Sequence, residues 1–372
     1  MTGRDALGAA DVPDRTLLTM VADQVGGPVD RIDSLVVEPV AYDVPSITTV
    51  GRWWVHGRAG TASFSFFVKQ VQAWSRSPVF ARVPEEHREA AAASYPWRIE
   101  REVYRSDLRD RLPSGLRMPR AYGVHDVDDE SYALWLEVVP TVEQSWSLDR
   151  FARAAYLLGR LSSSPDVAEV ADVGGFEMSA ETYRATRVTM QLEPILRSDI
   201  WEHPALSAFD PTLRGRLLAA LDRLPELAAE VGSLPRLAAH GDACPGNLLV
   251  TTDDPEGFTL IDFGQFTPLP VGFDLTQLLV GETMIGQLPA SALGPIEDVV
   301  VPAYTAGSGH DQDVVRRAHA VLLFVFTGLS TVPFDLLETT PPPELAAVAA
   351  ERAAVTRFSL DLLDATSPGA ST

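Results

Sequence analysis

Cysteine and lysine are almost absent from this chain of 372 residues. Cys244 is the only cysteine, which excludes an intramolecular disulfide and fits a reducing compartment. Lys69 is the only lysine among 30 basic residues. A site that needs a compact, mobile ammonium group cannot always accept the planar guanidinium of arginine. The single lysine is therefore a candidate functional residue.

Long apolar runs and positive charge are also scarce. The most apolar stretch, Ala318–Phe334, is broken by polar residues and is too short to span a bilayer, and Met1–Asp14 lacks the apolar run of a signal peptide. Acidic residues outnumber basic ones by 51 to 30, which gives a formal net charge of −21. Such a charge repels phosphate backbones. We therefore expect a cytoplasmic protein that binds neither nucleic acid nor membrane.

Strand and helix patterns divide the chain into two unequal parts. Before residue 140 the sequence predicts a leading helix at Arg15–Gln24, strands at 35–37, 53–55, 63–70, 122–124 and 131–138, and a helix at Ile99–Leu112. The turn between the strands at 53–55 and 63–70 is predicted at Gly57–Gly60. After it, helices are predicted at Leu148–Leu161, Ala180–Leu196 and Leu213–Val231, with short strands at 237–240, 248–251 and 258–261. We predict an α+β fold with a small strand-rich lobe at residues 1–139, a larger helical lobe at residues 140–372, and a ligand cleft between them.

One pair of polar motifs has the spacing expected of a catalytic site. The segment 240–247 reads His-Gly-Asp-Ala-Cys-Pro-Gly-Asn, and Asp262-Phe263-Gly264 follows Asn247 by fifteen residues at the end of an apolar strand. Asn247 and Asp262 supply the hard oxygen ligands that Mg²⁺ prefers when it also contacts phosphate. Asp242 stays off the metal and can accept a proton from an attacking hydroxyl. A polar turn and a β-bulge would explain each motif alone, but the pairing favours function.

These motifs resemble those of the aminoglycoside phosphotransferase and choline kinase-like family, over roughly Val36 to Leu337. The resemblance implies a two-lobed, protein-kinase-like fold, with Asp242 as catalytic base, Asn247 and Asp262 as Mg²⁺ ligands, and ATP as phosphate donor. Asp274 matches an aspartate that orders the catalytic loop, with a helix N-cap as the alternative, and His240 supports the same loop. Cys244, within that loop, is predicted to be an unreactive thiol.

The resemblance also requires a strand lysine paired with a helix glutamate. Lys69 lies near the end of the strand at 63–70, where it would contact the α- and β-phosphates. Glu100 and Glu102 are the two candidates for its partner. We favour Glu100, because it begins a row of residues four apart that should pack inward.

The predicted nucleotide site departs from kinases in one respect. Tyr42–Val50, where a glycine-rich loop would cover the phosphates, has no glycine, so hydroxyls are the candidate donors there (Ser46, Thr48 and Thr49). This departure leaves a donor other than ATP open. The backbone around Glu137 and Val139 would read the adenine edge, with an ordinary core strand as the alternative.

A small-molecule acceptor follows from two details. Asp274 follows Gly264 by only ten positions, which is too short a segment to hold a polypeptide, and Gly241 stands where protein kinases have arginine. We predict a kinase that phosphorylates a hydroxyl of a small metabolite or antibiotic-like molecule; Glu282, Asp335 and Glu338 could meet a cationic one, and antibiotic resistance is one candidate role. The alternatives are a non-catalytic kinase-like nucleotide-binding protein and a metal-dependent phosphoesterase. The acceptor and the oligomeric state stay open.

Overall fold

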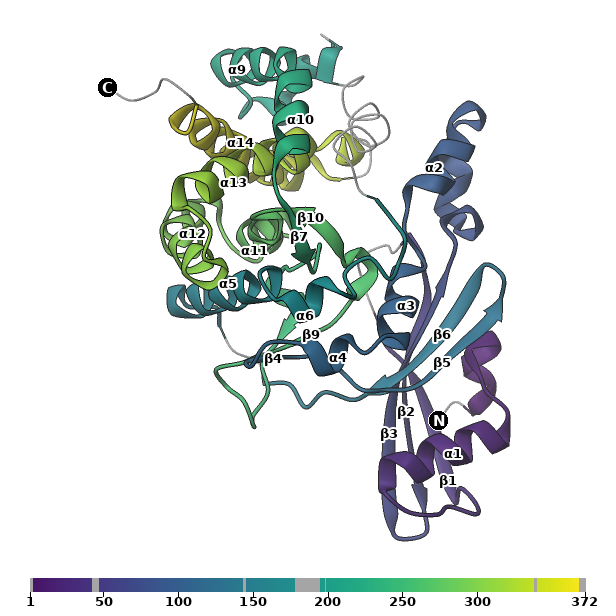
Figure 1. Cartoon of the computed structure of the whole chain (residues 1–372). Helices are drawn as coiled ribbons and strands as arrows, with labels where there is room; N and C mark the ends of the chain where they lie inside the picture. The colour runs from purple at the N-terminus through teal and green to yellow at the C-terminus, as the bar shows by residue number, and fades with distance from the viewer. Residues whose placement is uncertain are drawn as a thin grey trace.

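The fold is α+β with two lobes, as predicted (Figure 1). The computed structural model describes residues 3–41, 47–142, 145–177, 195–197, 199–337 and 340–367. A strand-rich part built from the first third of the chain lies beside a larger group of helices (Figure 1). In the described part of the chain, no helix is long and apolar enough to cross a membrane.

A five-stranded antiparallel sheet forms the N-terminal lobe, in the order β1-β2-β3-β6-β5. Its strands are β1 (Ser34–Pro39), β2 (Thr49–Ala59), β3 (Ala62–Gln72), β5 (Ala121–Asp128) and β6 (Ser131–Glu137). β2 continues through Gly57, so the turn to β3 lies at Gly60 and Thr61, where Gly60 takes a positive φ of 61°. The expected turn at Gly57–Gly60 was therefore wrong, and the hairpin register differs by four residues.

Successive side chains of a strand point to opposite faces of the sheet, and the two faces contact different helices. Phe64, Phe66 and Val68 of β3 pack with Trp135 under the leading helices η1 (Arg4–Ala10) and α1 (Asp14–Val25). The intervening positions, among them Lys69 and Val71, face the opposite side, toward α3 (Ile99–Arg105). Because Val68 points to the opposite face, the side chain of Lys69 points to the inner face of the lobe.

The segment between β3 and α3 was not predicted to have regular structure. It forms the short helices η2 (Trp74–Arg76), η3 (Pro78–Arg82), η4 (Glu85–His87) and α2 (Arg88–Ser94). The helix expected at Ile99–Leu112 is split into α3 and α4 (Leu108–Arg111). Ser106 leaves helical geometry at the break, and its Oγ accepts a hydrogen bond from the backbone N–H of Leu108 at 3.2 Å.

Helices make up most of the C-terminal lobe. They are α5 (Leu148–Ser162), α6 (Pro165–Ala168), η6 (Asp199–Glu202), η7 (Pro204–Leu206), α9 (Pro211–Asp222), α10 (Leu224–Ser233), α11 (Phe273–Met284), η10 (Ala290–Ala292), α12 (Leu293–Ser308), α13 (Gln312–Phe326), η11 (Gly328–Ser330), η12 (Phe334–Leu336) and α14 (Pro342–Ala365). The helix expected at Leu213–Val231 is interrupted at Arg223, because Pro225 begins a new helix. Most of the helix expected at Ala180–Leu196 lies outside the described residues.

Two small sheets hold the loops that carry the paired motifs. β7 (Arg236–Ala239) pairs with β10 (Thr267–Pro270), and the second sheet has the order β4-β9-β8. Its strands are β4 (Leu116–Arg117), β8 (Leu248–Leu249) and β9 (Phe258–Leu260). β8 and β9 form the expected hairpin between the two motifs, so Asn247 and Asp262 stand at its open end.

Helices α5 and α12 approach each other without side chains between their backbones. A Cβ atom at Gly307 would lie 2.1 Å from the carbonyl oxygen of Tyr156, and one at Gly159 would lie 2.4 Å from that of Tyr304.

We expect Gly307→Ala to lower the free energy of unfolding by about 1–3 kcal/mol, because the helices must separate. Gly294→Ala is the matched control on α12, since nothing lies within 4 Å of its Cβ. Urea unfolding of both variants measures the difference, and equal stabilities would contradict the close approach.

His319 of α13 is fully buried, and neither ring nitrogen has a hydrogen-bond partner among the described residues. Burial lowers the pKa of His319 from its usual 6.5 to about 4. The unfolded chain therefore binds a proton more readily, and stability is lost as pH falls from about 6.5 toward 4. We expect this residue alone to cost about 2 kcal/mol at pH 5 relative to pH 7.5. Urea unfolding of His319→Leu at both pH values should show a smaller loss than the unmodified protein; an identical loss would disprove the assignment.

Candidate active site

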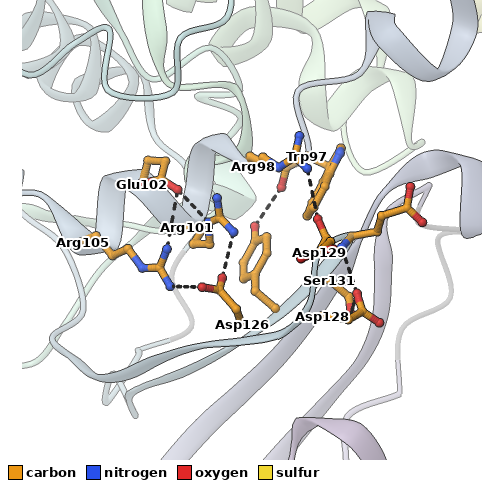
Figure 2. A network of polar contacts seen from close by, with 11 residues as sticks. Trp97, Arg98, Arg101, Glu102, Arg105, Asp126, Asp128, Asp129 and Ser131 are labelled. Carbon is orange, nitrogen blue, oxygen red and sulfur yellow. Dashed lines mark hydrogen bonds and ion pairs between the residues drawn. The ribbon is translucent and has the colours of Figure 1, made fainter.

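The single lysine forms a buried ion pair with helix α3. Lys69 Nζ lies 2.7 Å from Glu100 Oε2, and both side chains are more than nine-tenths buried. Glu102 lies elsewhere: its Oε1 accepts a hydrogen bond from Arg101 Nε at 2.7 Å on the outer side of the helix (Figure 2). Of the two candidate partners, the structure places Glu100 against Lys69.

A second carboxylate reaches the same ammonium group from the other lobe. Asp262 Oδ1 lies 3.0 Å from Lys69 Nζ. Burial alone would lower the pKa of Lys69, but the carboxylates of Asp262 and Glu100 more than offset it, so the pKa is raised. The lysine charge is also the main cause of the lowered pKa of Asp262. Lys69 is thus a permanent cation that joins the two lobes at neutral pH.

Asp262 adopts a left-handed backbone conformation that its neighbours do not share. Its φ and ψ are both 62°, and it is the one residue other than glycine with positive φ among those described. Aspartate tolerates this region better than most residues, but a conformation of this kind is often found at functional sites. It turns the chain out of β9 so that the carboxylate meets Lys69.

The loop after β7 is held in place by a buried carboxylate of α11. Asp274 Oδ2 accepts a hydrogen bond from the backbone N–H of His240 at 3.0 Å, and Oδ1 accepts one from Gly241 at 2.8 Å. Gly241 has φ 81°, and a Cβ atom there would lie 2.3 Å from the carbonyl oxygen of Gln265. The contacts of Asp274 are thus those predicted of a loop anchor, and glycine is required beside them.

His240 connects this loop to the loop that carries Asp262. Its side chain is fully buried; Nδ1 accepts from the backbone N–H of Asp242 at 3.3 Å, and Nε2 lies 2.9 Å from the carbonyl oxygen of Ile261. Nδ1 thus faces a donor of the first loop and Nε2 an acceptor of the second, so the ring bridges the two loops. One side chain therefore sets the spacing between Asp242 and Asp262.

Asn247 orients Asp242 through its amide nitrogen. Nδ2 donates to the carbonyl oxygen of Asp242 at 2.8 Å and to its Oδ2 at 3.2 Å. Burial raises the pKa of Asp242, and the nearby charge of Asp262 raises it further. A carboxylate with a raised pKa is a better proton acceptor, so the environment suits a general base.

The remaining oxygens of Asn247 and Asp262 fit a magnesium ion. With Asn247 Nδ2 donating to Asp242 and Asp262 Oδ1 paired with Lys69, Asn247 Oδ1 and Asp262 Oδ2 have no hydrogen-bond partner in the described part of the chain. Mg²⁺ usually takes one or two such oxygens from a protein and completes its shell with phosphate and water. No cluster of three or more His, Cys, Asp or Glu side chains suited to a metal occurs in the described ranges. The donor set therefore fits Mg²⁺ bound together with a phosphate ligand.

Only some of the other residues predicted to contact the nucleotide line the pocket that contains Lys69. Thr48 and Thr49 line one pocket together with Lys69 and the proposed catalytic carboxylates, whereas Ser46 lies outside the described residues. The side chain of Glu137 is engaged elsewhere, accepting from Arg117 Nη2 at 2.9 Å and from the backbone N–H of Arg120 at 3.0 Å. Pairing with β3 ends at Glu137. Val139 therefore lies beyond the sheet, and neither Glu137 nor Val139 is among the residues that line this pocket.

Sequence reasoning missed two features near Lys69. The pocket is also lined by three aromatic residues, Tyr95, Trp97 and Tyr132. Arg52 of β2 lies directly opposite Lys69 of β3, and cross-strand partners place their side chains on one face within about 5 Å. Placing the two-residue turn correctly would have revealed Arg52, because the position of that turn sets the pairing of β2 with β3. No local sequence pattern indicates that the three aromatic residues line the pocket.

Cys244 is not set up for chemistry. Burial and, next, the charge of Asp242 raise the pKa of its thiol to about 12. A thiol with this pKa stays protonated at neutral pH and is a poor nucleophile. This agrees with its expected unreactive role.

A model of the APH phosphotransferase enzyme family matches residues 55–311. The chain belongs to this family. The match includes the lysine strand, both polar motifs and the aspartate that anchors the loop. No curated protein sequence matches the chain significantly.

Solved structures of small-molecule kinases resemble the chain at low sequence identity. The GDP and kanamycin complex of APH(2″)-IIia is 15% identical, with 91% of this chain and 97% of that chain covered and a TM-score of 0.51. Spectinomycin phosphotransferase APH(9)-Ia, in complex with ADP and spectinomycin, is 10% identical over 95% and 99% of the two chains, with a TM-score of 0.49. Macrolide 2′-phosphotransferase MphH from Brachybacterium faecium is 20% identical over 91% and 97%, with a TM-score of 0.44. The first likeness shows that the chain has the kinase-like fold of these enzymes.

The contrast between Glu100 and Glu102 can be measured directly. We expect Glu100→Gln to weaken Mg·ATP binding at least about tenfold, because a lost charge-assisted hydrogen bond of about 1.5–3 kcal/mol leaves Lys69 misplaced. Glu102→Gln is the matched control, since its carboxylate is partly exposed and pairs only with surface arginines. Its affinity should stay within about twofold. Calorimetric titration gives both values, and equal effects of the two substitutions would show that the buried pair does not position the nucleotide.

Proposed function

We propose that this protein transfers the γ-phosphoryl group of ATP, or of another nucleoside triphosphate, to a hydroxyl group of a small molecule. The observation that carries the proposal is one pocket lined by a buried lysine, Lys69, and by the two loop carboxylates Asp242 and Asp262, of which Asp262 contacts the lysine. Family membership makes a phosphotransferase the class of activity to expect. The donor, the acceptor and the roles of the individual residues are our proposal.

Lys69 is the group that would bind the phosphates. Its ammonium has three protons, and two of them point to Glu100 and Asp262. The third is available for a phosphate oxygen, and Thr48 and Thr49 line the same pocket. Asn247 and Asp262 would hold Mg²⁺, which neutralises developing charge on the phosphates when it is bound.

Asp242 would orient the acceptor and take its proton. Its carboxylate is fixed by Asn247 and by the loop that Asp274 anchors, so little reorganisation is needed when a hydroxyl arrives. The raised pKa matches the task of accepting a proton as the oxygen attacks the γ-phosphorus. These groups act mainly by position and charge, which is how phosphoryl transfer is usually catalysed.

The fold supports a small acceptor rather than a polypeptide. After Asp262 the chain forms η9 (Phe263–Gln265) and at once pairs as β10 with β7, before α11 begins at Phe273. No residues remain for an extended platform of the kind that holds a peptide. Kanamycin and spectinomycin are bound by two of the similar structures. A hydroxylated, cationic antibiotic is therefore our first candidate acceptor, in accord with the net charge of −21.

The proposal is tested by ADP release from Mg·ATP with a panel of aminoglycosides, macrolides, peptide antibiotics, amino alcohols, nucleosides and sugars. We expect at least one acceptor to be phosphorylated and Asp242→Asn to lower kcat by about 10²- to 10⁴-fold while nucleotide binding persists, because only the proton acceptor is removed. Thermal shifts with Mg·ATP measure the binding. Unchanged turnover in Asp242→Asn would remove the base assignment. Binding of Mg·ATP with no phosphorylated acceptor would favour a non-catalytic nucleotide-binding protein.

Location and biological role stay predictions. The cytoplasmic location rests on the cysteine usage described above. Resistance, self-protection and ordinary metabolism would be separated by the identity of the acceptor that the panel finds.

A further inference from the structure

Helix α3 carries Glu100 but cannot hold its own position. It has seven residues, about two turns, and so few internal hydrogen bonds that packing must stabilise it. Its inner face is buried through Ile99, Glu100, Val103 and Tyr104. Its outer face meets the hairpin of β5 and β6, which continues the sheet beyond the lysine strand because β6 pairs with β3 (Figure 2).

A single carboxylate of that hairpin binds two arginines one turn apart on α3. Asp126 Oδ1 accepts a hydrogen bond from Arg101 Nη1 at 2.8 Å, and Asp126 Oδ2 accepts one from Arg105 Nη2 at 2.9 Å (Figure 2). Arg101 also donates from Nε to Glu102 at 2.7 Å. Both oxygens of Asp126 are therefore committed to the helix.

The hairpin contacts the start of the helix as well. Arg98 Nη2 donates to the carbonyl oxygen of Asp129 at 3.1 Å, and the hydroxyl of Tyr132 donates to the carbonyl oxygen of Trp97 at 3.0 Å. These contacts fix where α3 begins. The Asp126 contacts lie at Arg101 and Arg105, further along the helix, and fix its rotation.

Rotation of α3 decides whether Glu100 can reach Lys69. Consecutive helix residues point about 100° apart, so a carboxylate that fixes the direction of Arg101 also fixes that of Glu100. A small turn of the helix about its axis would carry Glu100 away from an ammonium group only 2.7 Å distant. The charge pair inside the lobe thus depends on an ion pair outside it.

We propose that Asp126 is a positioning residue for the active site: through Arg101 and Arg105 it holds α3 in the rotation that brings Glu100 to Lys69. The kinetic consequence rests on the proposed function, because it concerns how Lys69 is presented to a nucleotide. The effect of Asp126 on the contact between Glu100 and Lys69 does not depend on the proposed function. Asp126 is about half exposed, with 49% of its side chain accessible, so its ion pairs should add little to global stability.

Asp128 provides the matched control in the same hairpin. Pairing is irregular between Asp126 and Asp128, and the second carboxylate binds Arg76 of η2 at 2.7 and 2.8 Å instead of α3. Its exposure, at 44% of the side chain, is close to that of Asp126. Asp128 Oδ1 also accepts hydrogen bonds from the backbone N–H of Glu130 and from Ser131 Oγ, both at 2.9 Å. Asparagine keeps an Oδ1 acceptor for the turn, so Asp128→Asn removes a charge and an ion pair of the hairpin that do not involve α3.

The single lysine allows the structural claim to be tested without any activity. Protein labelled with ¹³C-lysine gives the side-chain signals of one residue, Lys69. We expect the Lys69 Cε signal to move in Asp126→Asn and in Glu100→Gln, and to keep its position in Asp128→Asn and in the carboxylate-preserving Asp126→Glu. The melting temperature of Asp126→Asn should fall by less than about 2 °C. An unchanged Lys69 signal in Asp126→Asn would overturn the proposal, as would an equal displacement in Asp128→Asn.

A double-mutant cycle tests the functional claim with the acceptor that the panel identifies. We expect Asp126→Asn to raise KM for Mg·ATP about tenfold, which corresponds to about 1.4 kcal/mol, and to have almost no further effect in a Glu100→Gln background. Full additivity of the two substitutions would show that Asp126 does not act through Glu100 and would overturn the proposal. If the unmodified protein phosphorylates nothing, the proposed function fails, and the lysine signal still decides the role of Asp126.

Discussion

The candidate active site depends on one buried cation shared by two lobes. Lys69 meets Glu100 from the N-terminal lobe and Asp262 from the C-terminal lobe, at 2.7 and 3.0 Å. Burying a lysine costs several kcal/mol unless its charge is paired and hydrogen-bonded. Two carboxylates meet that cost, and each of them is itself tolerated because the lysine is present. The position of the strand, of helix α3 and of the loop after β9 is thereby constrained by one ammonium group.

In the C-terminal lobe, hydrogen bonds of Asp274 and His240 hold the two loops that carry Asp242 and Asp262. Asp274 fixes the backbone of the loop at His240 and Gly241, and the imidazole of His240 joins that loop to the one that ends in Asp262. The buried ring of His240 thereby sets the distance between the two loops. Burial raises the pKa of Asp242, while the charge of Lys69 lowers the pKa of Asp262. Two aspartates of the same pocket thus have different electrostatic environments, one dominated by burial and the other by the lysine charge.

Local sequence patterns predicted much of this arrangement, and they failed where geometry depends on a single turn or on distant contacts. The two motifs around Asp242 and Asp262 were visible from their spacing. The family resemblance directed the search to Lys69 and a helix glutamate, and four-residue periodicity then favoured Glu100 over Glu102. The turn between β2 and β3 was placed too early, because Gly57 and Gly60 both look like turn residues. That error concealed Arg52, whose place opposite Lys69 follows only from the true register. The break at Ser106 was likewise hidden in a helical pattern, since a serine side chain that binds the backbone leaves no periodic signal.

The sequence by itself determined which chemical groups are present and the order in which the chain presents them: one lysine, a loop with a carboxylate and an amide five residues apart, and a second carboxylate at the end of a strand. These follow from residue type and short-range periodicity, which a linear chain displays directly. Only the tertiary structure decided that Glu102 faces the surface arginines, that Tyr95 and Trp97 line the pocket, and that Asp126 supports α3 from outside. Those outcomes depend on contacts between residues tens of positions apart. Such contacts are set by how helices and sheets pack, and no local pattern of the chain encodes the angle at which they meet.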